Sequence, residues 1–312
     1  MTQEKRQRRD LHGILLLDKP PGMTSNGALQ RVKRLLNARK AGHTGSLDPL
    51  ATGMLPICFG EATKVTGFML NADKAYRVAA RLGAGTDSGD ADGTVTVTSS
   101  QPAAHEQDLL AALAGFVGKT EQMPPMYSAL KHEGQRLYTL ARRGIEVERP
   151  RRAIEIYSAE LRRYEFPEVD IEVRCSKGTY IRTFVEDLAK SLGTVAHVTA
   201  LRRLFVEPFS ASAMLSIEAV EALASSDHDP IAASLLPVDS ALAHWPRLTV
   251  AAEDADKLVQ GQTVAAAPDW PESRVRMYSP GERFFGIGEI LAHRRLVPKR
   301  IFPALGPWSQ TL

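Results

Sequence analysis

The sequence predicts an α+β fold arranged in two domains, and three observations carry this prediction. At 312 residues the chain is long enough for two hydrophobic cores, since a domain usually spans roughly 100–200 residues. Up to about residue 208, short apolar runs typical of strands alternate with segments of helical periodicity. From about Pro246 the pattern changes to short strands around a single helix. We therefore expect one domain at 1–245 and a smaller, mostly β domain at 246–312.

Five runs in the first domain have strand character, being either continuously apolar or alternating: 13–17, 54–59, 74–82, 169–175 and 198–203. Helices are expected at four places where apolar residues recur at helical spacing: 25–36, 63–70, 109–117 and 180–192. Thr24 is among the residues able to cap the first helix, and Thr179 lies in a turn able to cap the last, which Gly193 ends. The acidic stretch 85–93 is predicted to be a turn, because it lacks the glutamate that would complete a calcium loop.

In the second domain, three runs predict strands at 275–278, 284–290 and 296–302, with a turn at Pro280-Gly281 and a helix at 254–259. Basic residues gather near its end, at Arg294, Arg295, Lys299 and Arg300. This combination is similar to a PUA-type RNA-binding barrel.

Composition excludes several classes of protein. Hydrophobic residues at 44% and charged residues at 24% are typical of a soluble globular protein, and a net charge of +3 does not by itself indicate nucleic-acid binding. Cys58 and Cys175 cannot form a disulfide framework or complete a four-ligand zinc site. The first ten residues lack the apolar core of a signal peptide, and no apolar run approaches the roughly 18 residues of a membrane span. We expect a cytoplasmic protein with no membrane partner.

The segment 40–53 holds one acid, Asp48, among small and apolar neighbours. Gly42, Gly45 and Gly53 permit backbone geometries that other residues avoid, and Pro49 restrains Asp48 to an extended conformation. Residue types alone leave two interpretations open. Asp48 is either part of an ordinary Asp-Pro turn or a poorly solvated nucleophile.

The sequence of this segment closely resembles the active-site motif of the TruB family, the bacterial tRNA pseudouridine-55 synthases. The matching residues are Gly-His-Thr-Gly-Ser-Leu-Asp-Pro-Leu-Ala-Thr-Gly. Three further segments resemble the family in order and spacing: Lys74-x-Tyr76, 175–182 and 198–203. The resemblance implies a pseudouridine-synthase fold, a mixed and mainly antiparallel sheet with flanking helices, followed by a PUA-like β-barrel. It also implies an RNA-gripping insertion around 120–152.

The implied activity is isomerisation of uridine to pseudouridine at position 55 in the T loop of tRNA. Nothing enters or leaves in this reaction except a proton, so we expect no cofactor and no metal. The resemblance assigns the nucleophile to Asp48, attacking either C1′ of the ribose or C6 of the base. Because burial raises the pKa of a carboxyl group, a cation must keep it ionised, and the family pattern gives this role to Arg182 as a bidentate partner. Tyr76 would stack on the uracil and help to take the C5 proton.

A uridine in a folded loop has to be flipped out of its stack before it reacts. The resemblance implies that His43 fills the vacated space and that Tyr180 and Leu201 line the base pocket. Lys19 and Lys64 are expected at phosphates or at the edge of the pocket. Basic residues at 31–40 and 131–152, the latter interleaved with tyrosines, are expected to contact RNA phosphates. The expected partner is the T-arm stem-loop of tRNA, bound by a monomer.

Two other classes of function remain open on sequence grounds. One is an RNA-binding protein or RNA chaperone, which the basic segments would serve equally well. The other is a small-molecule enzyme that uses Asp48 covalently, for which only His43 is available nearby in the sequence to activate water. The trio of Asp48, Tyr76 and Arg182 favours the isomerase, because a protein that only binds has no use for it.

Overall fold

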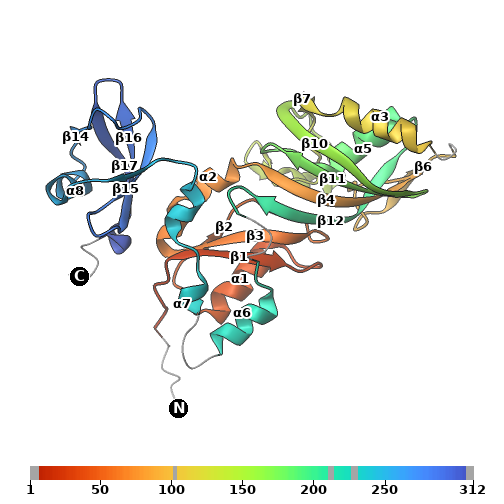
Figure 1. Cartoon of the computed structure of the whole chain (residues 1–312). Helices are drawn as coiled ribbons and strands as arrows, with labels where there is room; N and C mark the ends of the chain where they lie inside the picture. Colours follow the sequence, from red (N-terminus) through yellow and green to blue (C-terminus); the bar gives the residue numbers. More distant parts are fainter. Residues whose placement is uncertain (1–6, 101–103, 210–213, 226–230, 307–312) are drawn as a thin grey trace, which may run out of the picture.

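The computed structural model describes residues 7–100, 104–209, 214–225 and 231–306 (Figure 1). Its larger sheet has eight strands in the described residues, in the order β1-β3-β12-β4-β11-β10-β7, with β2 pairing with β3. The strands of this sheet are β1 (Gly13–Lys19), β2 (Ala41–His43), β3 (Thr52–Phe59), β4 (Lys74–Leu82), β7 (Gly118–Gln122), β10 (Arg152–Glu165), β11 (Glu168–Cys175) and β12 (Ala196–Val206).

Every neighbouring pair in this sheet is antiparallel except β12 and β3, which run parallel and pair only through Arg202 with Thr52 and Arg203 with Gly53. The sheet is therefore mixed and mainly antiparallel, which confirms the predicted fold class. The short parallel contact joins two halves of the sheet, β1–β3 on one side and β12 to β7 on the other.

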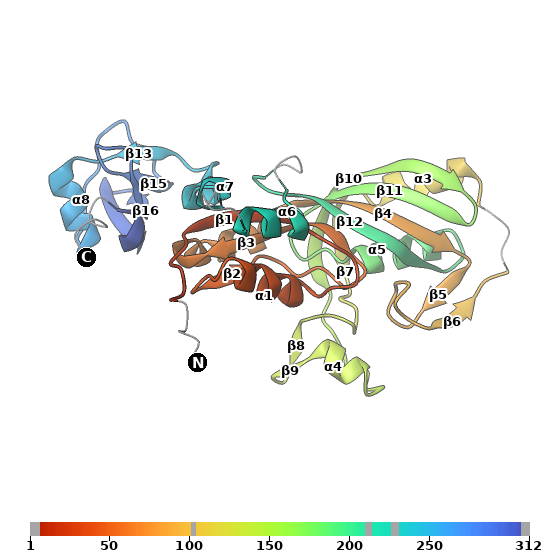
Figure 2. The ribbon, with the colours of Figure 1, turned by 90° about the horizontal axis from the view of Figure 1, so that it is seen from below.

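Helices cover the two halves separately. On one half, α3 (Glu106–Gly115) and α5 (Ile181–Ser191) pack on the alternately buried residues of β4, such as Val78 and Ala80. On the other half, α1 (Ser25–Leu35) and α6 (Ile217–Ala224) pack on β1 and β3 (Figures 1 and 2). Thr24 caps α1 as predicted, because its hydroxyl accepts a hydrogen bond from the Gly27 N–H at 3.0 Å.

Three local predictions need correction. The helix expected at 63–70 is a 3₁₀ turn, Gly60–Lys64, followed by the short α2 (Thr66–Leu70). Thr179 does not cap α5: its hydroxyl donates to the Ser176 carbonyl, and Tyr180 occupies the cap position without a side-chain bond. The stretch 85–93 is more than an acidic turn, since β5 (Ala84–Thr86) and β6 (Val95–Thr98) pair around it and Asp90 is buried.

The basic stretch 131–152 leaves the sheet between β7 and β10. It forms a small hairpin, β8 (Lys131–His132) and β9 (Gln135–Arg136), followed by the short α4 (Leu137–Ala141). Figure 2 shows this unit projecting away from the rest of the molecule.

The second sheet has five strands in the order β13-β15-β16-β17-β14, packed against α8 (Ala252–Val259). Its strands are β13 (Arg247–Thr249), β14 (Val264–Ala265), β15 (Arg274–Tyr278), β16 (Phe284–Leu291) and β17 (Arg295–Ile301). This curled sheet agrees with the expected PUA-like barrel. Short segments lead into it: α7 (Ile231–Ser234) and the 3₁₀ turn Val238–Leu242.

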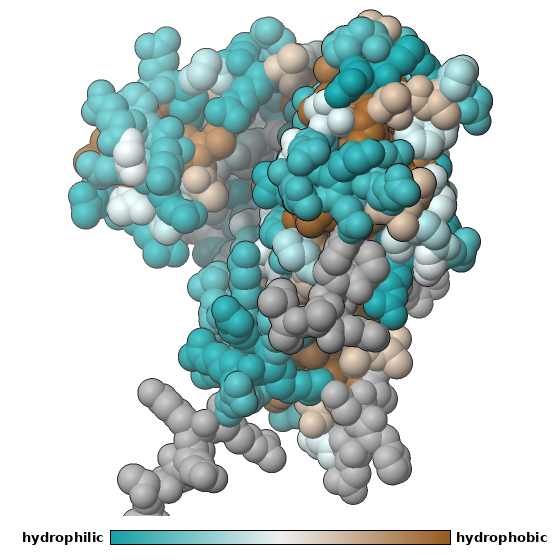
Figure 3. Space-filling view, turned by 90° about the vertical axis from the view of Figure 1, so that its left-hand side faces the viewer, coloured by the Kyte–Doolittle hydropathy of each residue, from teal (hydrophilic) through white to brown (hydrophobic). Residues whose placement is uncertain are grey.

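The two sheets share a hydrophobic core. Ile14 and Met54 of the first sheet belong to the same buried cluster as Phe284 and Phe302 from the C-terminal region. Burial of apolar surface stabilises such a contact by roughly 25 cal/mol per Å². The C-terminal sheet is therefore packed against the edge of the first sheet rather than joined by a linker alone. Seen from the side of the C-terminal sheet, the surface is mostly hydrophilic, with hydrophobic side chains showing in small areas (Figure 3).

Candidate active site

The Asp48 loop, residues 44–51, connects β2 with β3 and is held at several points by residues from elsewhere in the chain. The Ser25 hydroxyl donates to the Leu47 carbonyl at 3.1 Å and accepts from the Leu47 N–H at 2.7 Å. The Pro49 carbonyl accepts from the Gly22 N–H at 2.9 Å and from Lys19 Nζ at 3.3 Å. A loop held on both sides of Asp48 leaves its carboxylate little freedom to move.

Arg182 meets Asp48 in the centre of this site. Arg182 is 5% exposed, and its Nε lies 3.0 Å from Asp48 Oδ2. Its other nitrogens are committed elsewhere: Nη1 donates to the Ser88 carbonyl at 2.6 Å and Nη2 to the Tyr127 carbonyl at 2.7 Å. The predicted ion pair is thus present, but the predicted bidentate geometry is wrong. Two backbone carbonyls orient the guanidinium, and Nε is the nitrogen that lies beside the carboxylate.

Asp90 is the site residue that the sequence did not reveal. Its Oδ2 lies 3.6 Å from Arg182 Nε, so two carboxylates share one guanidinium. Asp90 is itself held by the Ser88 hydroxyl at 2.6 Å and the Asp92 N–H at 3.2 Å. The dense run Asp87-Ser88-Gly89-Asp90 was visible in the sequence, but nothing local indicates that it folds against α5.

The pKa of Asp48 is raised above its ordinary value, first by burial, with Arg182 opposing the shift and the Asp90 charge adding to it. Its side chain is nevertheless 41% exposed, so the carboxylate is accessible from one side. A carboxylate that is poorly solvated, paired with one oriented cation and open to approach has the properties of a nucleophile.

Tyr76 lies on β4, paired in register with Arg203 of β12, and is 8% exposed. One buried cluster joins it to the other motifs, since Leu47 and Ala51 of the loop pack with Tyr76, Ile181 and Leu201. Burial raises the pKa of the Tyr76 phenol, and Arg203 opposes that shift. The phenol is therefore a weaker acid than free tyrosine and stays protonated at neutral pH, so it holds little phenolate with which to take the C5 proton, and stacking is the role that this environment favours.

His43 and Tyr180 stand at the margins of the loop. His43 is half-buried on β2, and within the described residues its Nδ1 has no hydrogen-bond partner. Burial and the charge of Arg203 both lower its pKa, so the imidazole is neutral at neutral pH. Tyr180 is half-buried at the start of α5, where the Gln122 amide binds both its N–H at 2.7 Å and its carbonyl at 3.0 Å.

The two predicted lysine contacts have other partners in this structure. Lys19 is fully buried, and its Nζ donates to the carbonyls of Pro20, Met23 and Pro49, while burial lowers its pKa to about 8. Lys64 Nζ binds Glu61 at 2.8 Å and the Ile301 carbonyl at 3.1 Å. Lys19 is thus closed off from solvent, whereas the Lys64 side chain is 26% exposed. Lys19 holds the loop, and Lys64 ties the two sheets together.

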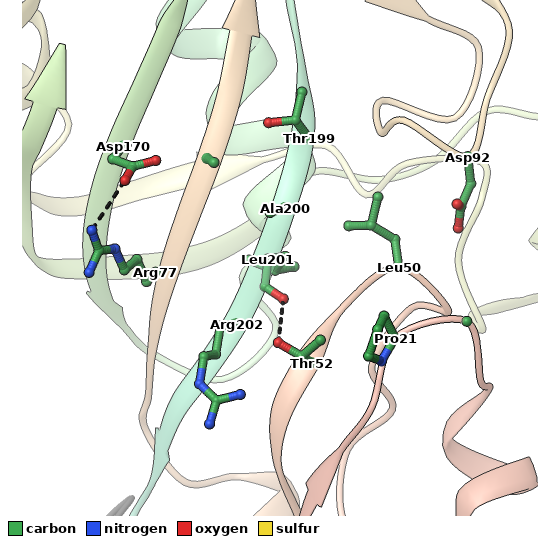
Figure 4. A pocket seen from close by; sticks show the side chains of 12 residues that line it. Pro21, Leu50, Thr52, Arg77, Asp92, Asp170, Thr199, Ala200, Leu201 and Arg202 are labelled. Carbon is green, nitrogen blue, oxygen red and sulfur yellow. Dashed lines mark hydrogen bonds and ion pairs between the residues drawn. The ribbon is translucent and has the colours of Figure 1, made fainter. Parts of the chain in front are cut away.

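A cleft of about 650 Å³ lies beside the loop, where β3 and β12 meet (Figure 4). Leu50 and Thr52 line it from the loop side, and Leu201 and Arg202 line it from β12. The Thr52 hydroxyl donates to the Leu201 carbonyl at 3.4 Å across this junction. Asp48 and Tyr76 are not among the residues that line the cleft, which reaches the loop at Leu50.

The predicted basic segments are largely exposed. In the insertion, Lys131, Arg136 and Arg143 project into solvent. In α1 and the loop after it, Arg34 and Lys40 are exposed. The cluster near the C-terminus differs. Arg294 donates to the Trp270 carbonyl at 2.9 Å and to that of Ala267, and Lys299 pairs with Glu289 at 2.7 Å. Only part of that cluster is available to a ligand.

In the ranges that the structure describes, no group of three or more His, Cys, Asp or Glu residues is placed to hold a metal ion. Within the same ranges, every helix falls short of the length or apolar character needed to cross a bilayer.

Comparison with known protein families gives matches along most of the chain. Residues 33–181 match "TruB family pseudouridylate synthase (N terminal domain)". Residues 182–243 match "tRNA pseudouridylate synthase B C-terminal domain", and residues 246–302 match "Pseudouridine synthase II TruB, C-terminal".

Curated relatives agree over nearly the full length. The chain is 52% identical to tRNA pseudouridine synthase B of Nitrosococcus oceani, over 96% of this chain and 97% of that protein. It is 50% identical to the protein of the same name from Chromohalobacter salexigens, over 95% and 96% of the two chains. Among solved structures, a chain of a Cbf5-Nop10-Gar1 complex has the same fold, with a TM-score of 0.71 and 22% identity over 93% of this chain and 84% of that one.

Proposed function

This chain belongs to the TruB family of pseudouridylate synthases, and on that premise we propose that it isomerises uridine 55 in the T loop of tRNA, with Asp48 as nucleophile. One observation carries the proposal. Asp48 lies 3.0 Å from an oriented, buried Arg182, in a loop that packs directly on Tyr76 and Leu201. Four segments far apart in the sequence thus meet around one carboxylate.

In the proposed reaction, the Asp48 carboxylate attacks C1′ or C6 of the flipped uridine, and the N1–C1′ bond breaks. The uracil turns within the pocket, C5 bonds to C1′, and the link to the carboxylate breaks. The C5 proton is lost and N1 gains one, so substrate and product are isomers and the enzyme is regenerated. The reaction needs Asp48 to be ionised before attack, which is the task we assign to Arg182.

The surroundings of Asp48 support the handling of a detached base. Tyr76 and Leu201 offer apolar surface on which a uracil can stack between bond breaking and bond making. A neutral His43 suits the space that the flipped uridine vacates in the RNA stack. Tyr180, whose backbone is held by Gln122, supports the same pocket from the start of α5.

We assign RNA binding to the exposed cations of the insertion and of the segment 31–40. The insertion is also linked to the chemistry, because Arg182 binds the Tyr127 carbonyl and the Tyr127 hydroxyl lies 3.2 Å from Asp87. Closure of the insertion on a T arm would therefore act on the loop that orients Arg182. In this proposal residues 246–312 contact RNA away from the reacting base, and the enzyme acts as a monomer in the cytoplasm.

The test is release of tritium from tRNA labelled at C5 of its uridines. The wild type should release one equivalent per tRNA, and the Asp48→Asn variant should release none while still binding tRNA. If the wild type binds tRNA without releasing tritium, the proposal is refuted, and an RNA-binding function without catalysis is the remaining explanation. A protein indifferent to tRNA would point to a small-molecule substrate.

A further inference from the structure

We propose that Arg203 is a positioning residue for this reaction, whose buried guanidinium fixes both ends of the Asp48 loop against β12, the strand that pairs with Tyr76. This inference rests on the proposed function, and it concerns a side chain that touches neither the cleft nor Asp48.

The contacts of Arg203 span the loop. Its Nε donates to the Met54 carbonyl at 2.7 Å, just after the loop, and its Nη2 donates to the Gly45 carbonyl at 3.1 Å, just before Asp48. Tyr76 is the cross-strand partner of Arg203 in the β4–β12 register. One planar group therefore holds the two ends of the loop at a fixed separation, on the strand that pairs with Tyr76.

Two glycines of the loop motif fit closely around the same residue. Gly53 has a φ of +95°, and a Cβ built there would lie 2.2 Å from the Arg203 carbonyl oxygen. Gly45 has a φ of +73°, and a Cβ there would lie 3.5 Å from Arg203 Nη1. β12 thus passes so close to Gly53 that any side chain there would strike the backbone of Arg203. At Gly45 the space beside Arg203 is ordinary contact, and the left-handed φ is what favours glycine.

Arg203 is also an unusual residue to bury. It is 1% exposed, and within the described residues it forms no ion pair with a carboxylate. Burying an unpaired charge is costly, and a neutral side chain of similar length would fill the same volume. Its charge is felt around the site, because it lowers the pKa values of His43, Lys19 and Lys74. The carbonyl groups of Gly45 and Met54 are the acceptors that compensate it, so the buried charge acts on the two ends of the loop.

A displacement of about 1 Å in a catalytic group can reduce a rate by about 100-fold without affecting binding of the distant parts of a substrate. If Arg203 acts by placing Asp48 and Tyr76, its loss should lower kcat and leave tRNA affinity nearly unchanged. A residue needed only for folding would instead lower the fraction of active protein and leave kcat per folded molecule as it is.

The experiment compares Arg203→Met, Arg203→Lys and a control, Arg81→Met, which removes an exposed arginine from the far end of the same sheet. Tritium release under single-turnover conditions gives the rate, filter binding of tRNA gives Kd, and circular dichroism with a thermal melt gives the folded fraction. Wild type and Asp48→Asn run in the same assay. If wild type itself releases no tritium, the proposed function fails, independently of Arg203.

We expect Arg203→Met to lower the rate about 100-fold with Kd within about threefold of wild type. The rate of Arg203→Lys should exceed that of Arg203→Met by less than about tenfold, because one ammonium cannot span both carbonyls. The control, Arg81→Met, should have the wild-type rate and Kd. A folded Arg203→Met within threefold of the wild-type rate would overturn the proposal. If Arg203→Met does not fold, Arg203→Lys decides the question. A folded Arg203→Lys with a lower rate and an unchanged Kd supports the positioning role. The proposal is overturned if Arg203→Lys has the wild-type rate, loses as much affinity as rate, or also fails to fold.

Discussion

The Asp48 loop and the insertion around 120–152 use the same types of cationic side chain in opposite ways. Around the loop, Arg182, Arg203 and Lys19 are buried and bind backbone carbonyls. In the insertion, cations such as Lys131 and Arg136 are exposed. A buried cation defines where the atoms of the loop lie. An exposed cation adds attraction for any phosphate nearby and is weakened by salt.

This comparison separates the expected effects of mutation. Changes around the loop should alter the rate of the chemical step, because they move or neutralise groups that act at one position. Changes in the insertion should alter affinity, because phosphate contacts are numerous and individually weak.

The largest effect is expected for Asp48→Asn. This nearly isosteric change removes the nucleophile, and we expect turnover to fall by at least about 10⁴-fold while tRNA Kd stays within a few fold. Tritium release and filter binding measure the two quantities. The matched control is Asp187→Asn on the surface of α5, where the acid pairs with Lys190. Turnover within tenfold of wild type would remove Asp48 from the role of nucleophile.

Arg182→Lys should lower kcat by about 100-fold or more and change KM little. A lysine retains the charge beside Asp48 but cannot also bind the carbonyls of Ser88 and Tyr127, so the cation is no longer oriented. Steady-state kinetics on a T-arm stem-loop measure the split. A variant that raised KM alone would show that Arg182 serves the RNA and not the carboxylate.

Asp90→Asn should move the acid limb of the kcat profile to lower pH. The pKa of Asp48 lies above its ordinary value, so activity that requires the ionised form is lost as pH falls through that raised pKa. Removing the Asp90 charge removes one cause of the increase, so ionisation of Asp48 persists to lower pH. A profile from pH 4 to pH 8 measures this, with Asp187→Asn again as control. If the acid limb of the kcat profile stayed in place or moved to higher pH, the Asp90 charge would not be raising the pKa of Asp48.

The paired change Lys131→Gln and Arg136→Gln should weaken tRNA binding about three- to tenfold and leave the single-turnover rate at saturation unchanged. The slope of log Kd against log salt should fall by about one unit per lost phosphate contact. The Arg81→Met variant, which removes an exposed arginine paired with Glu168, serves as control. A lower rate at saturating tRNA would show that the insertion takes part in the chemical step, and the Asp48 loop and the insertion would then not differ in role as we expect.

The smallest effect is expected in the C-terminal sheet. Arg300→Gln removes an exposed charge, and we expect KM for full-length tRNA to rise less than about threefold, with no change for a short T-arm stem-loop. Complete removal of this sheet is a poorer test, because it would expose the core that Ile14 and Met54 share with Phe284 and Phe302. Equal effects on both RNAs would place Arg300 near the reacting base.

Much of this protein follows from the sequence alone, wherever the determining interactions are local. Alternation of apolar and polar residues predicted β4 at 74–82, because side-chain direction in a strand has a period of two. A hydroxyl before an amphipathic run predicted the cap at Thr24. The Asp48, Tyr76 and Arg182 motifs were visible as short patterns. Their convergence in one cluster agrees with the family that these patterns resemble.

Only the tertiary structure decided what the long polar side chains contact. Lys19 turns inward to three carbonyls, Arg182 reaches Asp48 through one nitrogen, and Asp90 shares that guanidinium. A lysine or arginine side chain can extend in many directions from the same backbone position, so its partner depends on which distant strands lie beside it. Here the register that pairs β12 with both β3 and β4 brings Arg203 against Gly53 and Tyr76, and no pattern within either segment could have specified that contact.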